Sequence, residues 1–195
     1  MPEIVLSILI CSLHKRFGML GKLLRNLEYQ ITDAQANDLV EVLVNADGGE
    51  KSTGRKRNEL LKQAKGKYVM AVDDDDRVSE RYIVELLEAA KSDADCFSIS
   101  GYMWTNGVNK RDWHISKDYE YCTKKNAAGE DVYYRFPNHI TPIKRSIAVQ
   151  FEFPDKYQFE DFEWASKIKA SGLIKTEHRI EYVPIYIYDF VTSKK

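Results

Sequence analysis

Strand and helix patterns alternate through the first hundred residues of the chain. Residues 4–11 form a continuous apolar run, which is typical of a strand covered on both faces. Apolar residues then recur at helical spacing, at Leu20, Leu23, Leu24, Leu27 and Ile31. Further strands are predicted over residues 40–44, 68–72 and 96–100, with helices around Leu60 and Leu86 between them. This order predicts an α/β fold with a mostly parallel central sheet and helices on both faces.

The second half of the chain has a different pattern. Asn106-Gly107 lies between two β-rich runs and predicts a hairpin. Aromatic residues become frequent over residues 102–136, so we expect a small antiparallel region with long loops. A helix is predicted over about residues 159–170, because apolar side chains recur there every three residues. The tail, residues 182–190, is again typical of a strand.

Size and composition indicate one globular domain. The chain has 195 residues, of which 44% are hydrophobic and 30% are charged. The net charge of −1 excludes a positive field over the whole protein for binding nucleic acid, although a local basic patch is still compatible with it.

Compartment and membrane association are also suggested by the sequence. No apolar stretch approaches the roughly 18 residues of a membrane-spanning helix, and no basic region precedes the first apolar run as in a secretory signal. The three cysteines have no metal-binding spacing and are odd in number. We therefore expect a cytoplasmic protein.

Four consecutive aspartates, residues 73–76, directly follow the third predicted strand. Adjacent carboxylates repel one another, and a hard divalent cation relieves that repulsion. Alternate side chains of an extended backbone point to the same side, so Asp73 and Asp75 can act together. A solvated acidic turn would look the same in composition, but ligands of parallel sheets bind beyond the carboxyl ends of the strands, where this run lies. We interpret the pair as candidate ligands of Mn2+ or Mg2+.

A basic segment, residues 51–67, precedes the aspartate strand and contains one acidic residue, Glu59. Cations beside a carboxylate-bound metal suit a diphosphate, because the metal bridges its oxygens while Lys or Arg takes the remaining charge. Lys56 and Arg57, at the start of the predicted helix, are the candidates for this role. The later lysines of the segment are interpreted as a solvated helix face.

Glu160 and Asp161 begin the last predicted helix. The helix dipole alone favours acidic residues there. A carboxylate at this place could also serve as a general base, since transfer of a group to a hydroxyl requires that the hydroxyl proton be removed.

The same four aspartates could belong to two other known motifs. A calcium loop starting at Asp73 is excluded, because Val78 occupies the required glycine position and Val84 the twelfth position. Asp74-x-Asp76 also resembles the nucleophile motif of haloacid-dehalogenase-like phosphatases. That motif normally ends the first strand of the fold, whereas this run comes after at least two other strands. The phosphatase hypothesis is therefore the weaker one.

Taken in order, the motifs resemble the family-two glycosyltransferases of the GT-A fold. The motifs are the loops Cys11-Ser12-Leu13-His14 and Val44-Asn45-Ala46-Asp47, then Arg57-Asn58, Ala64-x-Gly66-x-Tyr68, Asp73-x-Asp75 and Phe159-Glu160-Asp161. The likeness covers roughly residues 4–190. Residues 135–145 further resemble short, soluble members that are common in bacteriophage and bacterial genomes.

On the donor side, the resemblance implies roles for five residues. Ser12 and Asp47 would hold the nucleotide base and ribose, and Arg57 would lie near the nucleotide. Asp73 would contact the ribose or the metal, and Asp75 would ligate the metal. The donor would be a nucleotide-diphosphate sugar, with a UDP-sugar expected first. The loop after the second strand lacks the family's usual double aspartate, which weakens the assignment of Asp47.

On the acceptor side, Asp161 would be the base of an inverting displacement, oriented by Glu160. Asn138 and His139 would lie near the acceptor or the diphosphate, and a loop histidine with satisfied hydrogen bonds is the alternative for His139. Many family members supply a late histidine to the metal; here the tail has none, and Asp189 or water would take its place.

The resemblance thus implies a single GT-A domain over residues 1–195. About residues 1–100 would form a nucleotide-sugar half and about residues 101–195 an acceptor half. The expected activity is metal-dependent inverting transfer of a sugar to a hydroxyl of a glycan, protein, small molecule or, in a phage-encoded enzyme, a hydroxymethylated DNA base. A non-catalytic module that binds nucleotide, glycan or nucleic acid is the alternative function.

Overall fold

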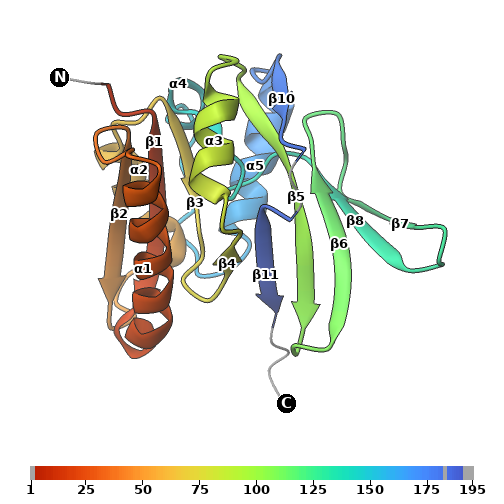
Figure 1. Ribbon diagram of the computed structural model, residues 1–195, viewed down its shortest axis with the longest axis horizontal. Coiled ribbons are helices and arrows are strands. Elements are labelled where there is room, and N and C mark those ends of the chain that lie inside the picture. Colours follow the sequence, from red (N-terminus) through yellow and green to blue (C-terminus); the bar gives the residue numbers. More distant parts are fainter. Residues whose placement is uncertain (1–2, 182–183, 191–195) are drawn as a thin grey trace.

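The computed structural model describes residues 3–181 and 184–190, which form a mixed sheet with helices on both faces (Figure 1). The strands are β1 (Leu6–Leu13), β2 (Val40–Asp47), β3 (Tyr68–Ala71), β4 (Arg77–Val78), β5 (Cys96–Thr105), β6 (Asn109–Ile115), β7 (Cys122–Lys125), β8 (Asp131–Arg135), β9 (Ile143–Lys144), β10 (Glu177–Arg179) and β11 (Tyr186–Phe190). The helices are the 3-10 turn η1 (His14–Arg16) and α1 (Phe17–Asp33), α2 (Thr53–Gln63), α3 (Tyr82–Ala90), α4 (Arg145–Ala148) and α5 (Glu160–Ser171).

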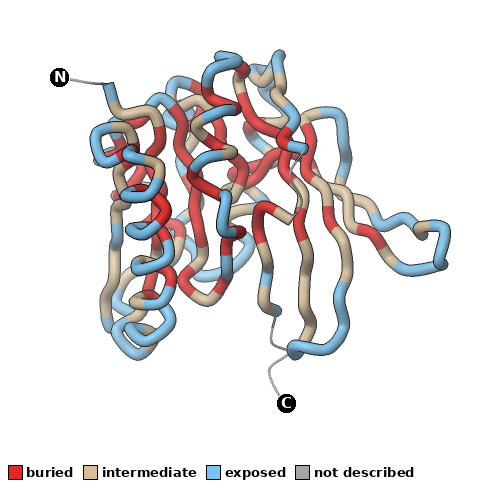
Figure 2. Tube along the Cα trace, viewed as in Figure 1, coloured by how far each residue is buried: buried red, intermediate tan, exposed pale blue. Residues whose placement is uncertain are grey.

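Side chains of β1 alternate between two separate hydrophobic cores. Leu6, Ile8 and Ile10 pack with the apolar stripes of α1 and α3 on one face of the sheet. Leu9 points to the opposite face, where α2, α4 and α5 pack. Figure 2 shows the buried residues running through the centre of the molecule between these layers. Both faces of β1 are covered, which is why its sequence is a continuous apolar run.

The N-terminal half has the predicted α/β arrangement. Strand β1 pairs in parallel with β2 on one side and with β3 on the other. The carboxyl ends of these three strands therefore meet at one edge. Ser12 and Asp47 lie at the ends of β1 and β2, and Asp73 follows β3. This edge is where a ligand of an open α/β sheet is expected.

The C-terminal half adds a mixed region and not the purely antiparallel one that was predicted: β5–β6 and β7–β8 are antiparallel, whereas β6–β8 and β10–β5 are parallel. The predicted hairpin joins β5 to β6, and both Asn106 (φ 53°) and Gly107 (φ 71°) adopt the left-handed conformation that a tight hairpin turn requires. Strand β9, only two residues long, is inserted antiparallel between β3 and β5 and was not expected. Strand β11 pairs in parallel with β5. Residues 182–183 of the predicted tail strand lie outside the described ranges.

In the described part of the chain, no helix is both long enough and apolar enough to cross a bilayer.

Candidate active site

A cavity of about 870 Å³ opens beyond the carboxyl ends of β1 and β3. Both halves of the chain contribute to its walls. Of the residues predicted from the sequence, those that line it are Ser12, Lys56, Arg57, Asp73, Asp75, Asn138, His139, Glu160 and Asp161. Asp47 is not among the lining residues. A cavity of this size is in the range of small-molecule sites.

The four aspartates after β3 divide into an inner and an outer pair. Asp74 is 3% exposed and accepts hydrogen bonds from Ser12 Oγ (2.5 Å) and Arg16 (2.8 Å). Asp76 is 5% exposed and accepts from the Tyr186 hydroxyl (2.6 Å) and the Asp189 amide (3.0 Å). The side chains of Asp73 and Asp75 are 33% and 37% exposed. Asp73 and Asp75 are therefore the more exposed pair. The reason differs from the predicted one, because residues 73–76 form a turn, in which the Asp76 amide donates to the Asp73 carbonyl at 3.1 Å, and not an extended backbone.

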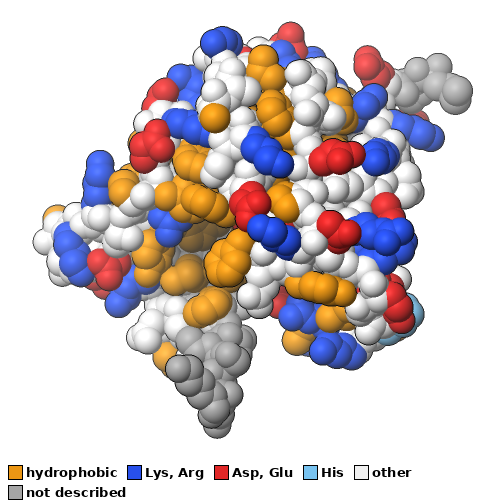
Figure 3. Space-filling view, turned by 180° about the vertical axis from the view of Figure 1, so that it is seen from behind, with side chains coloured by type: hydrophobic (Ala, Val, Ile, Leu, Met, Phe, Trp, Pro, Cys, Tyr) orange, Lys and Arg blue, Asp and Glu red, His pale blue; other side chains and the backbone are white. Residues whose placement is uncertain are grey.

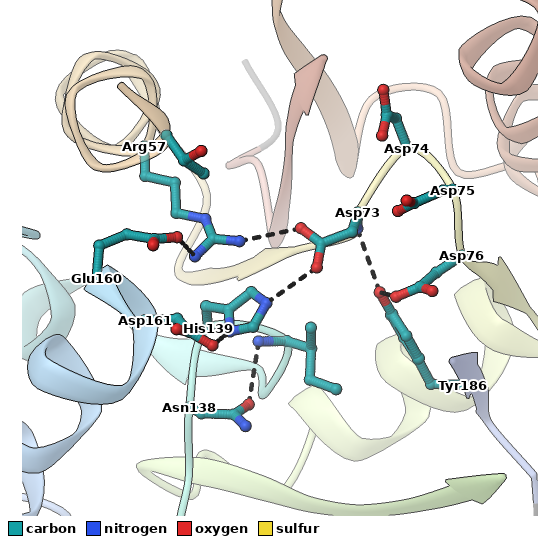
Figure 4. Close-up of polar contacts among 12 residues, drawn as sticks. Arg57, Asp73, Asp74, Asp75, Asp76, Asn138, His139, Glu160, Asp161 and Tyr186 are labelled. Carbon is teal, nitrogen blue, oxygen red and sulfur yellow. Dashed lines mark hydrogen bonds and ion pairs between the residues drawn. The ribbon is translucent and has the colours of Figure 1, made fainter. Parts of the chain in front are cut away.

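Asp73 is the centre of a charged network that joins both halves of the chain (Figure 4). One carboxylate oxygen contacts the Arg57 guanidinium at 3.0 Å, and the other contacts His139 Nε2 at 3.3 Å. Arg57 donates in turn to Glu160 at 2.5 Å, and His139 Nδ1 lies 3.3 Å from an oxygen of Asp161. Burial would raise the pKa of Asp73, but the charges of His139 and Arg57 hold it well below its usual range.

The backbone explains how His139 reaches Asp73. The carbonyl of His139 accepts a hydrogen bond from the Ala71 amide at 2.7 Å, directly before the aspartates. The preceding residue, Asn138, accepts from the Ile140 amide and donates from Nδ2 to the Tyr121 hydroxyl at 3.4 Å. The loop after β8 is thus fixed to the end of β3, and its side chains face the acidic residues.

Helix α2 places two cations at the cavity in its first turns. Its N-cap is Ser52, whose hydroxyl accepts from the Arg55 amide, so the helix begins at a defined residue. Lys56 is buried, donates to the Ser12 carbonyl at 2.8 Å and is ion-paired with Asp47. Asp47 also accepts from the Gly49 and Lys51 amides. These contacts hold Asp47 behind Lys56, which is why it does not line the cavity.

Helix α5 brings the Glu-Asp pair to the opposite wall. The segment before it is held on the start of α2, where the Gly54 amide donates to the Lys156 carbonyl at 3.0 Å. Glu160 is buried against Arg57, and burial raises its pKa although Arg57 opposes the shift. Asp161 is one-third exposed and faces both the cavity and His139. Glu160 is therefore a held, inner carboxylate, whereas Asp161 is accessible to a ligand.

Asp73 and Asp75 alone do not make a complete site for a divalent metal. Within residues 3–181 and 184–190, no three His, Cys, Asp or Glu side chains gather as a complete metal site. Mg2+, however, is commonly held by one or two carboxylates while water and substrate phosphates complete its shell. Asp75 suits this: burial raises its pKa, and neighbouring Asp73 and Asp74 raise it further against the opposing charge of Arg16. Asp73 and Asp75 could hold such a metal only together with oxygens of a phosphate ligand, because their present partners are Arg57, His139 and Arg16.

Two residues of the site were missed by sequence reasoning. Arg16 pairs with both Asp74 (2.8 Å) and Asp75 (3.0 Å), and its position directly after the first strand's loop was the only available signal. Tyr186 is buried, donates to Asp76 and accepts from the Asp73 amide at 3.2 Å. It lies in the tail, where the sequence pattern predicts a strand but gives no sign that a tyrosine would contact the aspartates.

Asp189, the expected substitute for the family's late metal-binding histidine, has another partner in the structure. Its two carboxylate oxygens accept from Arg77 at 2.5 and 2.8 Å, and it is not a lining residue of the cavity. Asp74, the nucleophile required by the phosphatase hypothesis, is buried with both oxygens engaged, as described above.

Comparisons with known proteins agree with this geometry. The sequence profile described as glycosyl transferase family 2 matches residues 10–153. No curated protein sequence matches the chain. The crystal structure of S. aureus TarS 1-349 matches with a TM-score of 0.60 at 16% identity, over 95% of this chain and 60% of that one.

Two similar structures are complexes of the same protein with nucleotides. TarS 1-349 in complex with UDP has a TM-score of 0.62 at 16% identity, and the complex with UDP-GlcNAc has 0.57 at 14%. They cover 95% and 98% of this chain, which spans 60% of the length of each. At this identity the likeness shows the fold alone, and it confirms the expected GT-A architecture.

Proposed function

The chain belongs to glycosyl transferase family 2, and from this premise we propose that it transfers a sugar from a nucleotide-diphosphate sugar to an acceptor hydroxyl with inversion. The proposal covers residues 1–195 as one catalytic domain, with a donor half and an acceptor half that meet at the cavity. We also propose a cytoplasmic setting, because three cysteines without a pairing or metal-binding spacing in the sequence suit a reducing compartment.

One observation carries the proposal: a continuous network joins the acidic loop to the last helix. Asp73 contacts Arg57 and His139, and these contact Glu160 and Asp161 respectively. A donor site and a base must face the same reacting carbon, and this network holds the two groups on facing walls of one cavity. A solvated acidic turn gives no reason for such a connection.

Each proposed role follows from the position of the residue. Asp161 accepts the proton of the acceptor hydroxyl, whose oxygen then forms the new bond to the anomeric carbon. The bond from that carbon to the diphosphate oxygen breaks on the opposite face, and the electron pair leaves with the diphosphate. A divalent cation held by Asp75 and Asp73 would neutralise the departing charge. Arg57 and Glu160 position Asp73, while Ser12 and Lys56 shape the nucleotide side.

Metal-dependent nucleotide binding tests the donor site. We expect UDP to bind in the presence of Mn2+, measured by calorimetry, and Asp75→Asn to weaken that binding at least tenfold because a metal ligand is lost. Asp38→Asn, on an exposed loop, is the matched control. Equal UDP affinity in Asp75→Asn and wild type would remove the proposed metal site.

Sugar transfer tests the base. A panel of nucleotide sugars with candidate acceptors, analysed by mass spectrometry, should give a product with the wild-type protein. Asp161→Asn should lower the transfer rate at least a hundredfold, within the usual range for a general base, and leave UDP affinity unchanged. Glu163→Gln, two residues further along α5 and ion-paired with Lys156, should keep wild-type activity. Full transfer by Asp161→Asn would exclude it as the base.

The same measurements separate the alternative functions. A non-catalytic binding module would bind UDP or a glycan without forming a product. A phosphatase would release phosphate from generic phosphoesters and depend on Asp74. The burial of Asp74 favours the transferase.

A further inference from the structure

Two exposed aromatic side chains border the cavity directly before the proposed base. Tyr157 and Phe159, called here the aromatic lip, are 63% and 72% exposed, and both line the cavity. Phe159 is two residues from Asp161 in the chain. A large exposed ring adds little to the stability of the core, so core packing does not explain the lip.

The backbone of the lip is strained and firmly held. Phe159 has φ 63° and ψ 7°, a left-handed conformation that is unusual for a bulky residue and that glycine adopts freely. Contacts from the start of α2 fix the segment, and the Tyr157 hydroxyl donates to the Gly49 carbonyl at 3.2 Å. Strain of this kind persists where the surroundings impose it, and it is concentrated at ligand sites.

The charges of the C-terminal wall of the cavity, formed by its lining residues after position 100, argue against an anionic acceptor; the other lining Lys and Arg residues lie on the donor side. Among its described lining residues after position 100, Arg135 is the only Lys or Arg. Its guanidinium lies over the rings of Tyr121 (4.7 Å) and Tyr133 (5.2 Å) and donates to the Cys122 and Tyr134 carbonyls. Polyanions are bound by Lys and Arg that remain available to phosphates. This wall lacks such a surplus.

Aromatic surface and polar groups are instead combined on this wall. The apolar and aromatic side chains that line it include Met103, Trp113, Ile115, Tyr133, Tyr188 and Phe190. Asn138, Gln158 and Asp161 supply hydrogen-bonding groups beside them. Figure 3 shows hydrophobic side chains gathered in a recessed part of one face, with charged groups of both signs around it. A sugar ring, with apolar C–H faces and hydroxyl edges, has the complementary chemistry.

We propose that the aromatic lip stacks on a neutral sugar ring of the acceptor and holds its hydroxyl toward Asp161, so that the acceptor is a glycan. The inference rests on the proposed function, since it takes Asp161 as the base. It separates the glycan acceptor from the DNA acceptor that the sequence left open. Phe159 is then a specificity-determining residue whose strained backbone serves substrate binding.

Acceptor binding can be measured without turnover. The probe is a panel of methyl glycopyranosides (gluco, galacto, manno and N-acetylglucosamine) in saturation-transfer NMR, with UDP and the diamagnetic Mg2+ present. We expect at least one glycoside to bind the wild-type protein with an affinity that does not change between low and high salt. Phe159→Gly should weaken this binding about 3- to 10-fold, the usual range for one aromatic contact, without changing UDP affinity.

Stability measurements distinguish a binding role from a structural one. Glycine adopts the left-handed conformation without strain, so the melting temperature of Phe159→Gly should stay equal to wild type or rise. Phe159→Asn, which also tolerates this conformation, is the second variant if the glycine loosens the segment. Tyr29→Ala removes an equally exposed aromatic ring from α1, on another part of the surface, and should bind the glycoside normally.

Each contrary result has a separate meaning. Unchanged glycoside binding in both Phe159 variants, or a large loss of stability in both, would overturn the role of the lip. UDP binding without binding of any glycoside would overturn the glycan acceptor, as would salt-sensitive binding of a single-stranded oligonucleotide that competes at this site. Failure of UDP itself to bind would contradict the proposed function. The comparison of glycoside binding between wild type and the Phe159 variants would still decide whether the aromatic lip binds a sugar.

Discussion

At the scale of single residues, Arg57 determines how the site is held together. It is buried, contacts Asp73 and Glu160 at 3.0 and 2.5 Å, and lies 5.7 Å from the centre of the Phe153 ring. A buried guanidinium between two carboxylates lowers the cost of burying both of them. Its removal would leave Glu160 as a buried charge with its main partner lost.

Replacement of Arg57 should therefore be strongly destabilising. We expect Arg57→Met to lower the free energy of unfolding by about 3–5 kcal/mol, measured by urea denaturation at neutral pH. Adding Glu160→Gln should restore part of this loss, because the unpaired carboxylate is then gone. Arg55→Met, on the exposed side of the same helix, should change stability by less than about 1 kcal/mol. Equal stability of the two single variants would contradict this role.

Residue identities at the site were predictable only where a local rule applied. The position directly after a buried strand identified the aspartate run, and the start of α2 identified Lys56 and Arg57. The alternation rule did not apply to Asp73 and Asp75, because residues 73–76 form a turn. No local rule showed that Arg57 would bridge Asp73 and Glu160, because that contact depends on how α5 packs on α2. For the same reason the position of Asp47 behind Lys56 was not foreseen.

At the scale of elements, the contact between α2 and the segment before α5 sets the geometry of the two walls. An added Cβ at Gly54 would lie 1.8 Å from the Pro154 carbonyl oxygen, so the backbones approach too closely for any side chain. The Gly54 amide also donates to the Lys156 carbonyl. A glycine at this position therefore fixes the distance between the donor-side helix and the base.

Gly54→Ala should separate these two elements. We expect a loss of about 1–3 kcal/mol in the free energy of unfolding, because the clash involves backbone atoms that cannot rotate away. Gly18→Ala, on α1 with open space around it, should instead gain up to about 1 kcal/mol from helix propensity. Thermal or urea denaturation of both variants checks the contrast, and a Gly54 variant as stable as wild type would show that the segment can shift.

The order of elements was largely predictable, but their pairing was not. Short segments rich in apolar residues identified β1, β2, β3 and β5, and helical spacing identified α1, α2, α3 and α5. Strand β9 has two residues and no pattern of its own, since its place between β3 and β5 is decided by the rest of the sheet. The same holds for β10, which is three residues long.

At the scale of the whole molecule, the last described strand supports the acidic loop, residues 73–76, which lies far from it in the sequence. Tyr186 on β11 donates to Asp76 and accepts from the Asp73 amide, although more than a hundred residues separate them in the chain. Strand β11 is held in turn by β5 and by the short strand β4 that follows the aspartates. The conformation of the acidic loop is thus a property of the complete sheet.

Loss of the Tyr186 hydroxyl should affect the metal site while the fold is kept. We expect Tyr186→Phe to lose about 1–3 kcal/mol of stability, because the buried Asp76 carboxylate loses one of its two donors. Metal-dependent UDP affinity, measured by calorimetry, should fall as the loop loses its support. Tyr102→Phe on the neighbouring strand β5 serves as the control. Wild-type UDP affinity in Tyr186→Phe would show that the loop holds its shape without this bond.

The link between Tyr186 and the aspartates has a consequence for biosynthesis. A ribosome completes residues 73–76 long before it adds Tyr186, so the nascent chain carries four adjacent acids that lack one of their hydrogen-bond donors. Until β11 has emerged and docked, Asp76 and the Asp73 amide lack the Tyr186 hydroxyl as a partner, and early capture of a cation would be weaker. Competence to bind the donor would then depend on a strand that is added more than a hundred residues after the aspartates.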